Sequence, residues 1–159
     1  MRKLVPTKAK RGNVAKADSY SEVFKRMDLA IKSGFFIEAL AIQEAIISDR
    51  LNSYINFSNP EFIKKNKTFG QLVAEWKKQF PEEIKDKVKL NLPVTVDIWR
   101  GLRNEAVHGI VKSTPGTATK AVKQFVEDGQ AAALMRRDLA RAVCKWHKDK
   151  KRKPSKADA

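Results

Sequence analysis

Apolar residues recur every three or four positions along most of this chain, which is the spacing of one face of an α-helix. The first such segment ends at Ser33-Gly34, and a second runs from about Phe35 to Phe57 before Ser58-Asn59-Pro60 interrupts it. The pattern favours helices throughout and gives no strand. The seam expected to be buried in the second segment consists of Phe36, Leu40, Gln43, Ile47, Leu51 and Tyr54.

Short polar motifs predict where several helices begin. Ser19 and Glu22 offer a capping box for the first helix, and Thr68 and Gln71 offer another before Leu72. The remaining segments are expected to begin at Pro81, at Pro93 and at about Thr117, the last reaching Lys148 with a weak point at Asp128-Gly129.

These segments predict an all-α fold, a single-domain antiparallel bundle of about five helices. A chain of 159 residues, 42% of them hydrophobic, can bury one core of ordinary size. Seven glycines and six prolines are too few for a β-sandwich with its many turns. We therefore expect one helical domain over residues 17–148.

Basic residues concentrate at the two ends of the chain. The formal net charge is +15, and residues 1–16 contain six Lys or Arg and no acidic residue. Residues 145–159 contain seven Lys or Arg against two Asp. Segments this poor in apolar residues cannot offset the entropy of ordering, so we expect disordered tails at 1–16 and 149–159. Such tails attract RNA or DNA phosphates without sequence preference, or serve only solubility.

Several protein classes do not fit this sequence. No apolar run reaches the roughly 18 residues of a membrane span, and no apolar segment follows the basic N-terminus as in a secretory signal. Cys144 is the one cysteine, which excludes an internal disulfide and favours a reducing, cytoplasmic location. Two distant histidines make no zinc pattern, and phosphate-binding and dinucleotide motifs are absent. We therefore expect no metal, no cofactor and no membrane partner.

The segment Leu102–Gly109, LRNEAVHG, combines the most chemically useful residues. It places Arg103, Asn104, Glu105 and His108 within two helical turns. An arginine holds a phosphate through its planar fork, and a histidine exchanges a proton near pH 7. An amide and a carboxylate beside them can orient both. Cleavage of a phosphodiester without a metal requires such a set.

Helical geometry limits how these groups can meet. Arg100, Asn104 and His108 are spaced four residues apart and share one polar face. Arg103 and His108 point about 140° away from each other. Two copies of the helix packed across a symmetry axis would bring the groups together, so the spacing favours a site at a homodimer interface.

The same helix has an apolar seam that we expect to face the core. Glu105 falls on that seam and would need a partner there. Trp99 lies one turn before Arg103; core packing is favoured for it, although it could also line the groove of the site. The seam consists of Val94, Ile98, Leu102, Ala106 and Gly109.

Two further polar pairs are not interpreted as sites, and the second is interpreted as an accidental match to the motif spacing. Glu38 and Glu44 lie on the helix Phe35–Phe57, where a solvated face is favoured over paired carboxylates for acid–base work. Arg141 and His147 repeat an arginine–histidine spacing, but they lack the adjacent Asn and lie next to the lysine-rich end of the chain.

Arg103-Asn104-x-x-x-His108 resembles the R-x4-6-H motif of HEPN domains in its common Arg-Asn form. The helix Phe35–Phe57, FFIEALAIQEAIISDRLNSYINF, is similar to the second helix of that family, and together the two cover about half of the chain. HEPN domains are small, all-helical and usually dimeric. Many are metal-independent endoribonucleases in toxin–antitoxin, abortive-infection and phage-defence systems.

The resemblance implies that RNA is the substrate and that cleavage leaves a 2′,3′-cyclic phosphate. Arg103 would clamp the phosphate, and His108 would activate the ribose 2′-hydroxyl or protonate the leaving oxygen. Asn104 would orient these groups, with Glu105 and Arg100 in support. An antitoxin or another regulatory protein is an implied partner. A family subgroup has a tyrosine, modified by its antitoxin, two residues after the histidine; Ile110 stands here, so we do not expect that regulation.

Three alternatives remain open. The chain could be a catalytically inactive HEPN-like module that binds RNA or a partner protein. It could be a helical DNA-binding protein with basic tails, although no recognition helix is evident. The motif could also be an ordinary helix C-terminus, with His108 near the negative end of the helix dipole and Gly109 permitting a cap.

Overall fold

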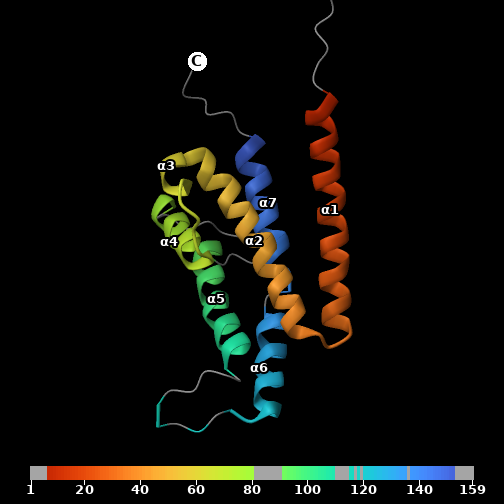
Figure 1. Cartoon of the computed structure of the whole chain (residues 1–159), viewed down its shortest axis with the longest axis vertical. Helices are drawn as coiled ribbons and strands as arrows, with labels where there is room; N and C mark the ends of the chain where they lie inside the picture. Colours follow the sequence, from red (N-terminus) through yellow and green to blue (C-terminus); the bar gives the residue numbers. More distant parts are fainter. Residues whose placement is uncertain are drawn as a thin grey trace, which may run out of the picture.

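The computed structural model describes residues 7–80, 91–109, 115–116, 118, 120–135 and 137–152. These residues form an all-α domain, and no extended strand occurs among them. Six helices have 11 residues or more, and a seventh has only four. The helices are α1 (Thr7–Lys32), α2 (Phe36–Ser58), α3 (Pro60–Ile63), α4 (Phe69–Gln79), α5 (Leu92–His108), α6 (Val122–Met135) and α7 (Leu139–Arg152) (Figure 1).

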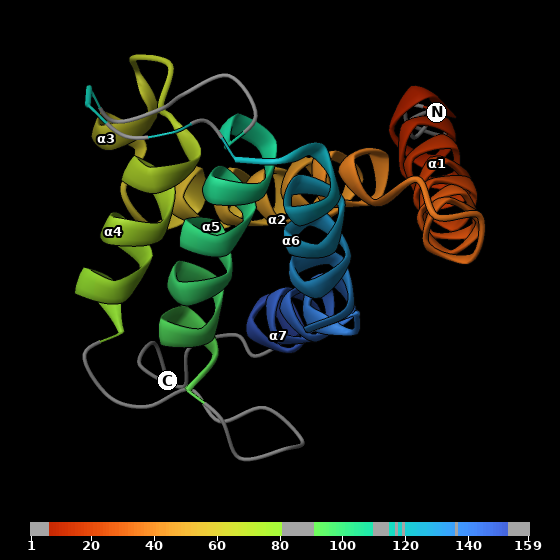
Figure 2. The same ribbon diagram turned by 90° about the horizontal axis from the view of Figure 1, so that it is seen from below.

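Helix α2 is the centre of the fold, because every other helix packs against it. Figure 2 shows α4, α5 and α6 side by side across α2, with α1 at the outer edge. The expected seam of α2 is confirmed, since Leu40, Gln43, Ile47 and Leu51 are fully buried. Burying one Leu or Ile side chain contributes about 1.5–3 kcal/mol, so this seam supplies much of the core energy.

The three tryptophans pack in the core, as expected. Trp76 and Trp99 are fully buried and Trp146 is 7% exposed. Trp146 joins α7 to α4 through Trp76, at 4.8 Å between ring centroids, and to α2 through Tyr54, at 4.9 Å. The capping box that begins α4 is also confirmed: Gln71 N–H donates to Thr68 Oγ1 at 3.3 Å, and Thr68 N–H donates to Gln71 Oε1 at 3.0 Å.

The relative directions of the helices differ from a simple antiparallel bundle. Helices α1 and α2 are antiparallel, as the ion pairs Lys16–Asp49 and Arg26–Glu38 show. Along α6 and α7, however, the chain runs in the same direction as α2. The side chain of Gln43 donates to the carbonyl of Ala133 at 3.4 Å, and further along both segments His147 Nε2 lies 3.3 Å from Ser53 Oγ.

The expected last helix is two helices, which raises the count from five to six plus the short α3. The break lies between Met135 and Leu139, and not at the predicted weak point Asp128-Gly129. Gly129 is buried inside α6. A Cβ at this position would lie 3.4 Å from Ile37 Cδ1, so glycine allows α6 to approach α2 closely.

The ends of the first and last helices also differ from expectation. Helix α1 begins at Thr7 instead of near Ser19, so the predicted capping box Ser19–Glu22 lies within the helix and more than half of the expected N-terminal tail is helical. Helix α7 continues to Arg152, beyond the predicted boundary at residue 148. The helix expected to begin at Pro81 lies in residues 81–90, outside the described part of the chain.

Candidate active site

Helix α5 carries the motif in its last two turns. At its start, Asn91 Oδ1 accepts a hydrogen bond from Val94 N–H at 3.2 Å, and Pro93 occupies the first turn, where its missing N–H has no cost. At its end, Gly109 N–H donates to the carbonyl of Glu105 at 2.8 Å. The motif side chains therefore lie near the negative end of the helix dipole.

Trp99 fixes the rotation of α5. Its indole Nε1–H donates to the carbonyl of Ala132 in α6 at 3.1 Å, and its ring meets Phe69 of α4 edge-on at 6.2 Å. It is fully buried, so it does not line a groove at the site. Leu92, Val96 and Ala106 are buried with it.

The seam predicted for α5 is therefore wrong for most of its residues. Ala106 is buried, but Val94, Ile98 and Leu102 are 41%, 53% and 36% exposed. Helix α5 has two apolar faces, and the one that contains the indole is buried because it removes more apolar surface from water. The other face, Val94, Ile98 and Leu102, remains exposed as an apolar stripe.

An ion pair connects the motif arginine to α2. Arg103 Nε lies 2.6 Å from Glu44 Oε2, and the two side chains are only 18% and 24% exposed. The Nε–H does not point at the carboxylate oxygen, so the contact is an ion pair without a well-directed hydrogen bond. Arg103 Nη1 also donates to Asn104 Oδ1 at 3.0 Å. The guanidinium is thus held between a carboxylate and an amide.

The hydrogen bond from Arg103 to Asn104 affects which motif side chains a single copy of α5 can bring together. The Cβ directions of Arg103 and His108 diverge by about 140°, but the guanidinium reaches Asn104, which shares a helix face with His108. One copy of α5 therefore brings arginine, amide and imidazole toward the same side of its last two turns. Among the described residues, no hydrogen bond or ion pair joins Arg103 to His108 directly.

Glu44 contacts the candidate site through Arg103, although a solvated face was expected for it. It follows the fully buried Gln43 on an apolar helix, and a carboxylate in such a position usually needs a positive partner. The place of Glu44 beside Gln43 on an apolar helix was therefore the sequence signal that could have indicated a paired carboxylate. The sequence contains too many arginines to identify Arg103 as the partner.

Arg100 takes part in a separate cluster between α4 and α5. Its Nε and Nη2 donate to Asp97 Oδ1 at 3.1 and 2.9 Å, and Lys77 Nζ donates to Asp97 Oδ2 at 2.8 Å. The hydrogen bond from Lys77, followed by that from Arg100, lowers the pKa of Asp97 below its ordinary value, against the effect of burial. Arg100 thus supports the position of α5 rather than extending the motif.

His108 is half-buried in the last turn of α5 and has no hydrogen-bond partner in the described part of the chain. Both ring nitrogens are thus open to a substrate. Glu105 is exposed, which corrects the expectation that it lies on the core seam. Its carboxylate acts on Lys120, whose pKa is raised mainly by a hydrogen bond to Asp128 and to a smaller extent by Glu105.

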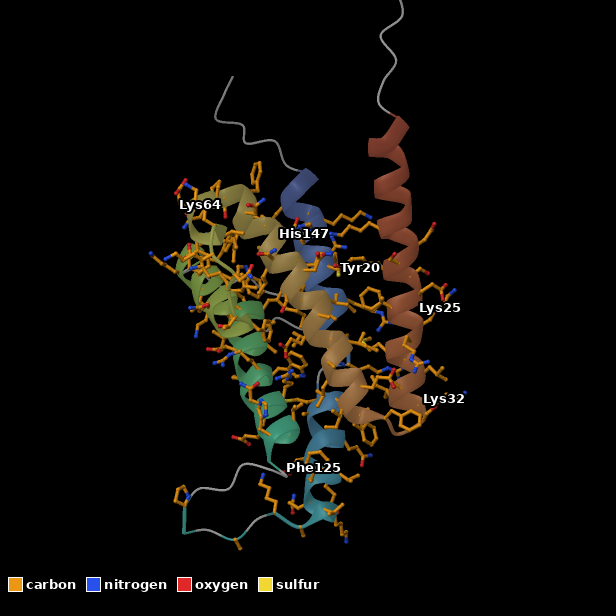
Figure 3. The ribbon with its side chains drawn as sticks, viewed as in Figure 1. Tyr20, Lys25, Lys32, Lys64, Phe125 and His147 are labelled. Atoms are coloured by element: carbon orange, nitrogen blue, oxygen red, sulfur yellow. The ribbon has the colours of Figure 1, made fainter. Side chains whose placement is uncertain are left out.

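The side chains of the second arginine–histidine pair contact other helices. Arg141 Nη2 donates to Asp28 Oδ2 of α1 at 2.7 Å and stacks over Phe24. His147 is 4% exposed and faces Ser53 of α2, on the inner side of α7 (Figure 3). The two side chains therefore serve different helix contacts.

Neither a metal cluster nor a membrane helix is found in the described ranges. No group of three or more His, Cys, Asp or Glu side chains could hold a metal ion there, and no helix is long and apolar enough to cross a bilayer. No protein-family model, no curated protein and no solved structure matches this chain.

Proposed function

We propose that this chain is a metal-independent endoribonuclease of the HEPN type, acting in a toxin–antitoxin or phage-defence system. The observation that carries the proposal is the arrangement at the end of α5. The guanidinium of Arg103 is oriented by Glu44 and Asn104, and His108 lies one turn beyond Asn104 with both ring nitrogens open. RNA is the proposed substrate.

The proposed reaction uses the ribose 2′-oxygen as nucleophile. The 2′-oxygen attacks the adjacent phosphorus as its proton is removed, and the bond to the 5′-oxygen breaks, leaving a 2′,3′-cyclic phosphate and a 5′-hydroxyl. Arg103 stabilises the charge that develops on the phosphoryl oxygens. His108 removes the proton from the 2′-hydroxyl or protonates the leaving 5′-oxygen, and solvent water carries out the other of these two proton transfers. Asn104 holds the guanidinium in position.

We further propose that two copies of the chain associate through α5. The exposed stripe Val94, Ile98 and Leu102 leaves apolar side chains in water on the helix that carries the motif. In projection His108 lies only about 40° from Val94, so it lies on the same side of α5 as this stripe, at the edge of an interface formed over it. An antitoxin or a regulatory protein remains a proposed partner.

One observation favours a second candidate function, an inactive HEPN-like module that binds RNA or a partner protein. The ion pair with Glu44 already neutralises Arg103, so a phosphate must compete with a carboxylate 2.6 Å away. A module of this kind would keep the fold and the dimer while Arg103 and His108 serve as structural polar groups.

Incubation of the purified chain with single-stranded RNA in excess EDTA distinguishes the two functions. The ribonuclease proposal expects cleavage that survives EDTA and leaves 2′,3′-cyclic phosphate ends, identified by mass spectrometry. If the folded chain binds RNA but leaves a mixed-sequence pool intact, the ribonuclease proposal is wrong and the binding module replaces it.

A further inference from the structure

A surface pocket of about 320 Å³ lies between α2 and the segment that joins α3 to α4. Its polar wall consists of Ser48 and Asn52 from α2 and of Lys65 and Asn66 from the connecting segment. Ile63 and Leu72 give it an apolar side. A hollow with a few convergent polar groups beside an apolar surface is typical of a site for a small ligand or for part of a larger one.

The polar side chains of this wall have unused hydrogen-bonding capacity. The side chains of these four residues make no hydrogen bond or ion pair with other described residues, and those of Asn52, Lys65 and Asn66 are exposed. The neighbouring Lys64 differs, because its Nζ forms an ion pair with Glu61 at 2.6 Å.

The pocket is continuous with the candidate active site along α2. Glu44, Ser48 and Asn52 are spaced four residues apart, so they share one face of the helix, about 6 and 12 Å along its axis from Glu44. The start of α4 connects the pocket to α5, the helix that carries the motif. Gly70 lies against the guanidinium of Arg100 in α5, and Leu72 lines the pocket.

The donor set matches a nucleotide. An ammonium such as that of Lys65 binds a phosphate as a point charge, and an Asn amide pairs a donor and an acceptor with the edge of a base. The apolar side formed by Ile63 and Leu72 suits a ribose or the face of a base.

One carboxylate lines the pocket, and its charge is already compensated. Asp49 accepts hydrogen bonds from Tyr20 and Lys16 of α1. These bonds lower the pKa of Asp49 although burial opposes the shift, so the group is ionised and paired. The charge of the pocket is therefore positive and comes from Lys65 and Lys67.

We propose that this pocket binds one nucleotide unit of RNA, its phosphate on Lys65 and its base edge on Asn52 and Asn66. The strand then follows the exposed face of α2 to Arg103, so the pocket is a subsite outside the reacting phosphate. The inference rests on the proposed function, because it assigns the pocket to the substrate strand. A free nucleotide offers the same phosphate and base and is the second source of this ligand.

The test is binding of a fluorescein-labelled 2′-O-methyl RNA oligonucleotide, which cannot be cleaved through its 2′-oxygen, followed by fluorescence anisotropy. The variant Asn52→Ala/Lys65→Ala removes one amide and one lysine from the pocket. The matched control Asn56→Ala/Lys64→Ala removes the same groups from the same two segments, outside the pocket; Figure 3 shows Lys64 at the α3 end of the molecule. Circular dichroism checks that both variants are folded.

The proposal expects the pocket variant to raise the Kd about tenfold or more, as the loss of charged and amide hydrogen bonds does, and the control by less than about threefold. Equal effects of the two variants, or no binding by the wild type, would overturn it. Binding of adenosine monophosphate distinguishes a free nucleotide from a unit of an RNA strand as the ligand. If it binds as tightly as the oligonucleotide and also loses affinity in the pocket variant, the ligand is a free nucleotide. The assignment of the pocket to the substrate strand is then wrong.

Cleavage of ordinary RNA, measured in parallel, keeps this inference distinct from the proposed function. A protein that binds through the pocket and cleaves nothing overturns the ribonuclease and the substrate role of the pocket, while the nucleotide site itself stands. A protein that cleaves RNA with the same KM in the pocket and control variants overturns the subsite and leaves the ribonuclease intact.

Discussion

Arg103 is the residue on which the candidate site depends, and Glu44 decides where its guanidinium lies. The two side chains are mostly buried and oppositely charged, so removing one charge leaves the other without compensation. Glu38 lies on the same helix and also pairs with an arginine at 2.6 Å, but its partner Arg26 is 63% exposed. The two pairs thus differ in burial, and only Arg26 donates a hydrogen bond to its carboxylate. They offer a comparison of a mostly buried with an exposed ion pair.

Glu44→Gln is expected to lower the free energy of unfolding by about 1–3 kcal/mol, because a partly buried guanidinium loses its counter-charge. Glu38→Gln should change it by less than about 0.5 kcal/mol, since exposed ion pairs contribute little. Urea unfolding at pH 7 measures both. Equal losses in the two variants would show that Glu44 does not hold Arg103 in the folded chain.

The carboxylate of Asp97 predicts a pH dependence. Lys77 and Arg100 depress its pKa in the folded chain, so its stabilisation is present above the ordinary value of 3.8 and is lost as the pH falls through the depressed value. Asp97→Asn should therefore destabilise the protein at pH 7, by less than about 1 kcal/mol because the partners are partly exposed. The difference from wild type should decrease as the pH falls below 3.8. A difference in urea-unfolding free energy that stays constant as the pH falls would contradict this assignment.

At the scale of helices, the sequence correctly predicted features that depend on residues close together in the chain. The Thr68–Gln71 box and the buried seam of α2 were predicted because each rests on residues close in sequence. The buried face of α5 was not predicted. Trp99 lies on one apolar face and the stripe Val94, Ile98 and Leu102 on another, and neighbouring helices determine which of the two faces is buried. The Glu44–Arg103 pair was missed for the same reason, since it joins two helices that are distant in sequence.

Gly129 and Gly101 offer a comparison within helices. Gly129→Val should lower the free energy of unfolding by about 1–3 kcal/mol, because a side chain there meets Ile37 where α6 crosses α2. Gly101 of α5 has no atom within 4 Å of an added Cβ, so Gly101→Ala should raise stability by about 0.5–1 kcal/mol. Thermal unfolding measures both changes. Stabilisation by both substitutions would show that α6 does not pack this closely on α2.

At the scale of the whole molecule, α2 organises the domain and leaves one side of α5 uncovered. The other helices pack around α2 (Figure 2), and the stripe on α5 is exposed. Apolar side chains grouped on one helix face are a common feature of protein interfaces. The polar side of α5, with Asn104 and His108, lies next to that stripe, so association and catalysis are expected to depend on neighbouring surfaces.

Sedimentation velocity at micromolar concentration should show a dimer for the wild type and a monomer for Ile98→Asp, because a carboxylate would be buried without a partner in the interface. Val126→Asp is the matched control: Val126 is 49% exposed, close to the 53% of Ile98, but lies on α6. It should remain dimeric. A monomeric wild type, or dimers for both variants, would contradict the proposed interface.

The most direct test of the central claim is the rate of RNA cleavage in EDTA by wild type, Arg103→Ala and His108→Ala. Each substitution should lower the rate by roughly two orders of magnitude or more, the usual effect of losing an electrostatic or acid–base group. Arg141→Ala, which removes an arginine paired with Asp28 far from the motif in sequence, should cleave at nearly the wild-type rate. Wild-type rates in both motif variants, or no cleavage by the folded wild type, would contradict the assignment of Arg103 and His108 to an RNA-cleaving site.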